Sequence, residues 1–197
     1  MGPRIALALS IAASTVLLPF ATRAAADEVV LAFSPNSLEH CADLAAKAEA
    51  NGTATPRSLT VCDDAIARAK DLRDELAAAY INRSVIHLAR LEYDAALADS
   101  DASLRIKSGL PQALVNRGIA LSAKGRNKEA AEAFTGALAL SPSHPETVYF
   151  NRAIAREDMG DVKGAYLDYR KAAQLDPSWD TPKQQLARFT VAHSPTS

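Results

Sequence analysis

The sequence lacks the motifs by which common enzyme classes are recognised. It contains no nucleophile elbow, no phosphate-binding loop and no HExxH metal motif. Its four histidines are scattered along the chain instead of forming a cluster. These absences predict a protein that is not an enzyme and that needs no cofactor.

The chain also lacks an excess of positive charge. All 23 acidic residues follow residue 26, whereas two of the 22 basic residues, Arg4 and Arg23, precede it, which gives the remainder a formal charge of −3. A nucleic-acid-binding domain presents a basic face. We therefore expect no nucleic-acid partner.

Only one long apolar run occurs, and it lies at the N-terminus. Arg4 precedes an uncharged apolar stretch over residues 5–21, and three alanines at 24–26 supply small residues before Asp27. This pattern is typical of a secretory signal peptide, here cleaved after Ala26. The run is shorter than the roughly 20 apolar residues of a membrane span and is broken by Pro19. We expect an exported protein, located in the bacterial periplasm, with no membrane span in the mature chain.

A six-residue block occurs three times, around Asn82, Asn116 and Asn151, at steps of 34 and 35 residues. A repeat of this period indicates stacked helical hairpins. Such a stack presents an extended curved surface that is suited to binding other molecules. The repeats thus predict a binding scaffold.

Residue types at fixed positions identify the repeat. Counted from Pro111, the second copy has Gly118 at position 8, Ala130 at 20, Phe134 at 24 and Pro142 at 32. This arrangement resembles the tetratricopeptide repeat, which has small residues at 8 and 20, an aromatic ring at 24 and proline at 32. The resemblance implies an all-α, right-handed superhelical stack of antiparallel helix hairpins with a C-terminal capping helix, opened by Thr181-Pro182 and running to about Ala192. The expected organisation is a signal peptide at 1–26, a degenerate N-terminal hairpin at 27–76, repeats at 77–110, 111–145 and 146–179, and a capping helix and tail at 180–197.

The resemblance gives the two cysteines a place. Cys62 falls at position 20 of the degenerate N-terminal hairpin, and Cys41 corresponds to position 8 if the intervening turn is lengthened. These positions touch in the family, so we expect a Cys41–Cys62 disulfide, as the even number of cysteines in an exported protein also favours. A metal or redox site that includes His40 is the alternative, although these three residues fall short of a closed zinc shell.

The resemblance also implies a binding face, because the first helix of each hairpin lines the inside of the curve. An asparagine at position 6 of every copy can pair with both polar groups of an extended peptide backbone, or can instead bridge neighbouring helices. No Lys or Arg points inward to clamp a chain terminus, and Glu157 and Asp158 favour a basic partner. The expected partner contacts are Asn82, Asn116, Asn151, Ile81, Val85, Val115, Ile119, Phe150 and Ile154.

Arginine follows this asparagine in every copy. An acid at position 23 faces it in two of them, which predicts ion pairs Arg83–Asp99 and Arg152–Asp168 within hairpins. Two functions fit the whole pattern. One is an exported interaction module that binds an extended peptide or partner protein on the inner face, and the other is an assembly subunit of an envelope complex that uses convex or edge surfaces.

Overall fold

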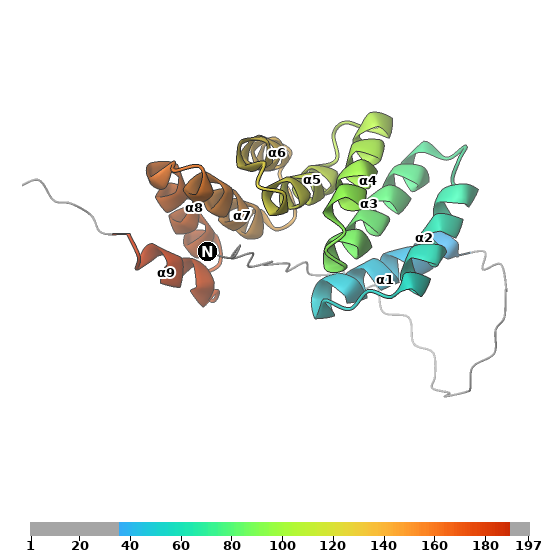
Figure 1. Cartoon of the computed structure of the whole chain (residues 1–197), viewed down its shortest axis with the longest axis horizontal. Helices are drawn as coiled ribbons and strands as arrows, with labels where there is room; N and C mark the ends of the chain where they lie inside the picture. The colour runs from blue at the N-terminus through green and yellow to red at the C-terminus, as the bar shows by residue number, and fades with distance from the viewer. Residues whose placement is uncertain (1–35, 190–197) are drawn as a thin grey trace, which may run out of the picture.

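The computed structural model describes residues 36–189, and within them the chain forms nine helices and no strand (Figure 1). The prediction of an all-α stack of hairpins is confirmed. The predicted signal peptide and the end of the C-terminal tail lie outside the described residues. The helices are α1 (Ser37–Asn51), α2 (Pro56–Arg68), α3 (Arg73–Ala89), α4 (Tyr93–Ile106), α5 (Pro111–Ala123), α6 (Asn127–Ala139), α7 (Pro145–Asp158), α8 (Val162–Leu175) and α9 (Asp180–Leu186).

Local chemistry explains several of the helix boundaries. Helices α2, α5 and α7 begin with proline, whose missing N–H has no partner in the first turn of a helix in any case. Thr55 caps α2 by accepting a hydrogen bond from the backbone N–H of Ser58 at 3.2 Å. At the turns between helices, Gly125 and Gly160 adopt φ values of 73° and 81°, in the left-handed region that glycine tolerates.

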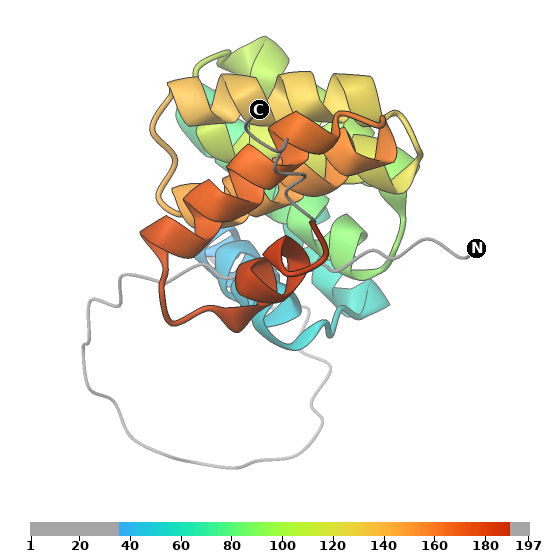
Figure 2. The ribbon, with the colours of Figure 1, turned by 90° about the vertical axis from the view of Figure 1, so that its left-hand side faces the viewer.

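The hairpins stack side by side along one axis, from α1–α2 at one end to α7–α8 at the other (Figure 1). Seen from the α8 end, successive hairpins lie behind one another, and α9 lies beside α8 (Figure 2). Helices α1, α3, α5 and α7 pack on one another in sequence, in addition to packing within their own hairpins. This arrangement places these four helices on the inner side of the curve.

Close approach of small residues holds the middle hairpin together. A Cβ atom on Gly118 of α5 would lie 2.6 Å from the ring of Phe134 on α6, so only glycine fits there. Phe134, Ala130 and Ala137 are fully buried beside it. The ring fills the space that the absent side chain leaves, which is the close packing expected of a protein interior.

The N-terminal hairpin is joined covalently. The structure contains a disulfide between Cys41 of α1 and Cys62 of α2, with Cα atoms 4.9 Å apart and both residues fully buried. The sulfur atoms pack in an apolar cluster with Ala45, Ala65 and Ile86. The disulfide thus lies in the core that α1 and α2 share with α3.

The C-terminal helix differs from the prediction. Helix α9 begins at Asp180 and ends at Leu186, so Thr181 lies inside it instead of capping it, and the helix is shorter than expected. Pro182 is accommodated because its position is still in the first turn, where a backbone N–H makes no bond within the helix. Among residues 36–189, no helix combines the length and the apolar character that crossing a membrane requires.

Candidate functional site

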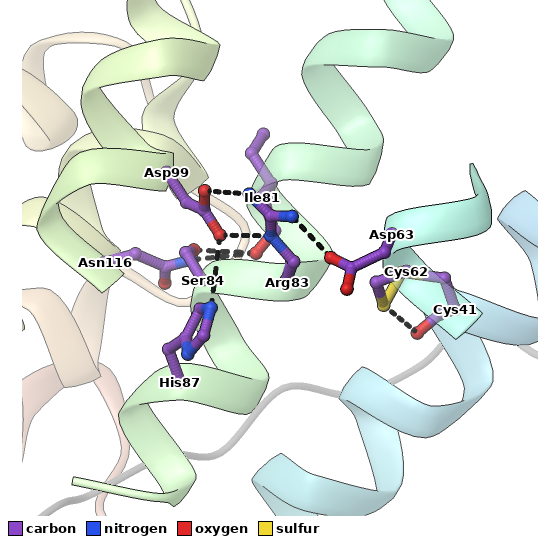
Figure 3. The surroundings of a disulfide bond; sticks show 9 residues. All are labelled: Cys41, Cys62, Asp63, Ile81, Arg83, Ser84, His87, Asp99 and Asn116. Carbon is purple, nitrogen blue, oxygen red and sulfur yellow. Dashed lines mark hydrogen bonds and ion pairs between the residues drawn. A yellow bond between two sulfur atoms is a disulfide. The ribbon is translucent and has the colours of Figure 1, made fainter. Parts of the chain in front are cut away.

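The asparagine at the centre of the expected binding face is part of the internal packing. Asn116 of α5 is 1% exposed, and its Nδ2 donates to Oγ of Ser84 at 2.6 Å and to the carbonyl of Ile81 at 3.4 Å (Figure 3). Gln112 donates to its Oδ1 at 3.3 Å. Because both polar atoms of the amide are engaged, Asn116 joins α5 to α3, and a partner has no access to it.

The other two asparagines at this repeat position are less buried and are not hydrogen-bonded within the stack. Asn82 of α3 and Asn151 of α7 are half-buried, and neither side chain makes a hydrogen bond to another of the residues in 36–189. The bond that holds Asn116 needs the hydroxyl of Ser84, whereas the equivalent residue before Asn151 is Gly118, which has none. Two of the three amides thus keep donors and acceptors available for a ligand.

The apolar residues expected on the inner face are unequally accessible. Ile81 and Ile154 are partly exposed, whereas Val85, Val115 and Ile119 are each at most 8% exposed. These three valine and isoleucine side chains contribute mainly to the packing between hairpins.

Phe150, expected as a partner contact, has no accessible surface. Its exposure is 0%, and its ring packs 4.7 Å from the ring of Trp179 and 5.4 Å from that of Tyr169, measured between centroids. Trp179 precedes α9, so the C-terminal cap covers the position at which a further hairpin or a partner would otherwise lie. In the described structure, Phe150 therefore packs under the cap and has no exposed surface on the inner face.

The predicted ion pairs are present and are bidentate. Arg83 donates to Asp99 through Nε at 2.8 Å and Nη2 at 2.6 Å, and Arg152 does the same to Asp168 at 2.8 Å for both bonds. Arg83 also donates to Asp63 of α2 at 2.5 Å, so one guanidinium links three helices (Figure 3). Hydrogen bonding to Asp99 is the main cause that raises the pKa of Arg83. These arginines are structural cross-links, which leaves them unavailable to a partner.

A pocket lies between α1 and α3, and the sequence did not indicate it. Its volume is about 370 Å³, and it is lined by Val85, Leu88, Ala89 and Leu91 of the α3 segment and by the end of α1 around Glu49. Glu49 is the only ionisable residue in the lining. Burial raises the pKa of Glu49 to about 7, and the nearby charge of His144 acts in the opposite direction.

The acids at the end of α7, expected to favour a basic partner, are partly engaged within the chain. Glu157 accepts a hydrogen bond from the hydroxyl of Tyr169 at 3.0 Å and forms an ion pair with Arg188. Asp158 remains exposed, and partial desolvation of its carboxyl group together with repulsion from Glu157 raises its pKa.

The residues proposed for the alternative metal site do not come together as ligands. Cys41 and Cys62 are joined to each other, and within residues 36–189 no group of three or more His, Cys, Asp or Glu side chains is placed to hold a metal ion.

The sequence contains one signal of the pocket between α1 and α3. Leu91 occupies the turn position at which the next two copies have Gly125 and Gly160.

Comparisons with known proteins agree with this architecture. The sequence model of the family described as "Tetratricopeptide repeat" matches residues 111–144 and 146–178. The fold is similar to that of MamA (residues 41 to the end) from Desulfovibrio magneticus RS-1, with a TM-score of 0.62 and 15% identity over 77% of this chain and 82% of that one. It is also similar to that of MamA AMB-1, with a TM-score of 0.56 and 22% identity over 72% and 80%. A search of curated protein sequences found no match.

The family match and the structural matches both fall on the hairpins α1–α8. The matched repeats are the two copies with the complete pattern of small, aromatic and proline residues, and the structural matches extend the similarity to most of the described helices. Tetratricopeptide repeat domains bind protein partners and are generally non-enzymatic scaffolds. Residues 111–144 and 146–178 are thus similar to the tetratricopeptide repeat, and the stack of hairpins is a fold that supports a protein–protein interaction module.

Proposed function

We propose that this protein holds an extended peptide, or an extended segment of a partner protein, along the inner face formed by α3, α5 and α7. The observation that carries the proposal is the state of Asn82 and Asn151, two half-buried amides with no hydrogen-bond partner among the described residues. Their polar atoms remain accessible to solvent, so a ligand can bond to them without breaking a hydrogen bond inside the chain. A peptide backbone supplies both the donor and the acceptor that such an amide needs.

Apolar contacts adjoin both amides. Ile81 precedes Asn82 and Ile154 lies one turn after Asn151, and both isoleucines are partly exposed. Alternation of amide and apolar contacts suits an extended chain, whose side chains alternate in direction. The expected ligand is therefore an extended segment with at least one apolar side chain.

Asparagine substitutions test this proposal with a control inside the molecule. Peptides selected from a random display library on the purified protein are measured by isothermal titration calorimetry against Asn82→Ala, Asn151→Ala and Asn116→Ala. The first two substitutions are expected to weaken binding with no loss of stability, since their side chains make no internal bond. Asn116→Ala is expected to lower the stability, because it leaves the hydroxyl of Ser84 without that partner. Unchanged peptide affinity in the Asn82→Ala/Asn151→Ala double variant contradicts the proposal.

We also propose that the protein is exported to the periplasm after cleavage following Ala26. The buried Cys41–Cys62 disulfide supports this, since disulfides persist in oxidising compartments. Mass spectrometry of the protein isolated from cells tests it. The expected N-terminus is Asp27 with both thiols oxidised, and an uncleaved chain with free thiols contradicts it.

A second function has one observation in its favour. Leu167 and Leu175 of α8 and Val162 at its start are at least 41% exposed, at the end of the stack that α9 covers only in part. An assembly subunit that binds through this edge is the alternative. Substitution of these residues by serine, with the inner face intact, abolishes partner capture only under this alternative.

A further inference from the structure

Leu91 has a backbone conformation that leucine rarely adopts. Its φ is 61°, in the left-handed region that residues with a side chain avoid because it costs them about 1–2 kcal/mol. The same turn follows α5 and α7, where Gly125 and Gly160 adopt it. In all three turns the backbone N–H of this residue donates three residues back, at 2.9–3.0 Å. Glycine would therefore fit here, yet the chain has leucine.

Burial within the chain does not offset this strain. Leu91 is 62% exposed, the highest exposure among the large apolar side chains that the structure describes. A strained residue persists where the surroundings hold it, and such residues cluster at ligand-binding sites. The combination of strain and exposure points to a role for the Leu91 side chain outside the packing of the hairpin.

Leu91 lines the pocket of about 370 Å³ between α1 and α3. The rest of the wall is apolar and comes from Val85, Leu88 and Ala89 of α3 and from Ala48 of α1. This volume is near the lower end of the range for small-molecule sites, and so suits one side chain better than a cofactor. The α1–α3 contact belongs to the inner side of the curve, so a segment bound along α3 passes the pocket.

One charge is set in this apolar wall. The carboxylate of Glu49 makes no hydrogen bond or ion pair with another residue in 36–189, and burial raises its pKa to about 7. Arg90, which follows α3, is directed elsewhere, since it pairs with Glu92 at 2.8 Å and donates to the carbonyl of Ala54 at 3.5 Å. The charge of His144 acts on Glu49 and lowers its pKa without offsetting the effect of burial. A cation placed beside Glu49 would stabilise its charged form.

We propose that the pocket binds a lysine side chain of the segment held on the inner face, with its alkyl part against Leu91 and Val85 and its ammonium group on the carboxylate of Glu49. Lysine buries its alkyl stem along apolar surface while its charged end stays in water. A carboxylate that is only partly buried, like that of Glu49, can pair with that charged end. This inference rests on the proposed function, because it names one residue type in the bound segment.

The pocket can be tested without a peptide. n-Butylammonium reproduces the lysine side chain, and n-butanol is its neutral counterpart. Each is titrated into the purified protein at pH 8 while backbone amide NMR signals of α1 and α3 are followed. We expect saturable shifts at Gly52, Val85 and Leu91 with n-butylammonium, and binding of n-butanol weaker by about tenfold, the usual effect of a hydrogen bond to a charged group.

Three variants separate the contributions of charge and shape. Glu49→Gln, which retains the shape of the side chain, is expected to remove the preference for the cation, whereas Glu132→Gln at an exposed site on α6 is expected to leave it unchanged. Leu91→Gly is expected to weaken n-butylammonium binding by about fivefold. Its thermal midpoint is expected to stay the same or rise, because glycine fits the turn. This opposite movement of affinity and stability is not expected of a residue with a purely structural role.

The results distinguish this inference from the proposed function. Equal binding of n-butanol and n-butylammonium, or an unchanged preference in Glu49→Gln, overturns the lysine pocket. Display-selected peptides that bind the inner face while n-butylammonium does not would overturn the pocket and retain the proposed function. Binding of n-butylammonium when the inner face binds no peptide would overturn the proposed function and retain the pocket as a site for an alkylammonium group.

Discussion

Removal of the carboxylate of Asp168 is expected to be among the most damaging single changes in the molecule. The side chain of Asp168 is 5% exposed and accepts two hydrogen bonds from Arg152 and a third from Arg156, all at 2.8 Å. Asp168→Ala leaves the partly buried guanidinium of Arg152 without an acid and removes the nearer of the two acids beside Arg156. Breaking a buried pair in this way costs about 3–5 kcal/mol. For a domain of this size the thermal midpoint is expected to fall by roughly 6–20 °C.

A matched pair elsewhere in the stack serves as the control. Asp101 accepts one hydrogen bond from Arg117 at 2.8 Å, but the side chains of this pair are 39% and 28% exposed. Water screens an exposed pair, so Asp101→Ala is expected to cost only about 0–1 kcal/mol. Both variants are measured by urea unfolding followed by far-ultraviolet circular dichroism. Both substitutions remove one carboxylate, so the comparison reports the combined effect of burial and of the two additional hydrogen bonds that Asp168 accepts.

The coupling between the partners gives a second test. In an Arg152→Ala background, Asp168 retains only Arg156, and the loss caused by Asp168→Ala is expected to shrink by about 1–3 kcal/mol. Equal losses in the two backgrounds would refute the claim that the pair acts as a unit. A loss no larger than that of Asp101→Ala would refute the role given to burial.

Three further predictions follow from the packing and the charges. Gly118→Ala places a methyl group 2.6 Å from the ring of Phe134 and is expected to lower the free energy of unfolding by about 1–3 kcal/mol in urea melts; an unchanged midpoint would contradict the close contact. Replacing Cys41 and Cys62 by alanine opens a loop with a sequence separation of 21 and is expected to cost about 3 kcal/mol, with faster hydrogen exchange confined to α1 and α2; exchange that rises equally throughout would contradict this local role. Burial raises the pKa of Glu49 from 4.5 to about 7, so the folded state binds the proton more tightly and the wild type loses stability as the pH rises between these values; Glu49→Gln is expected to abolish that loss, and parallel pH–stability curves would show the reasoning to be wrong.

The repeat period carried most of the information about the fold. A step of 34 or 35 residues with small side chains at fixed positions determines which helix faces which within a hairpin. The pairs Arg83–Asp99 and Arg152–Asp168 followed from the same register and are confirmed. The partner of Arg117 did not follow from it, because that pair crosses to the preceding hairpin and depends on the twist between repeats.

The inner face was harder to predict because its accessibility depends on what packs against each residue. The amide of Asn116 donates a hydrogen bond to Ser84 of the preceding repeat, and the later repeats have no hydroxyl at that position. Phe150 is covered by Trp179, which belongs to the C-terminal cap and has no equivalent in the repeat pattern. The pocket beside Glu49 lies where α1 packs along α3. The first hairpin departs from the repeat pattern, so the pattern could not predict this packing.

Photocrosslinking in cells shows whether a partner contacts the inner face. A photoreactive amino acid replaces either Ile81, which is partly exposed on the inner helix α3, or Leu167, which is 41% exposed on the outer helix α8. After irradiation, adducts are resolved by electrophoresis and identified by mass spectrometry. We expect a discrete protein adduct at position 81 that disappears when Asn82 and Asn151 are replaced by alanine. An adduct formed only at position 167 would contradict this expectation and move the function to the edge of the stack.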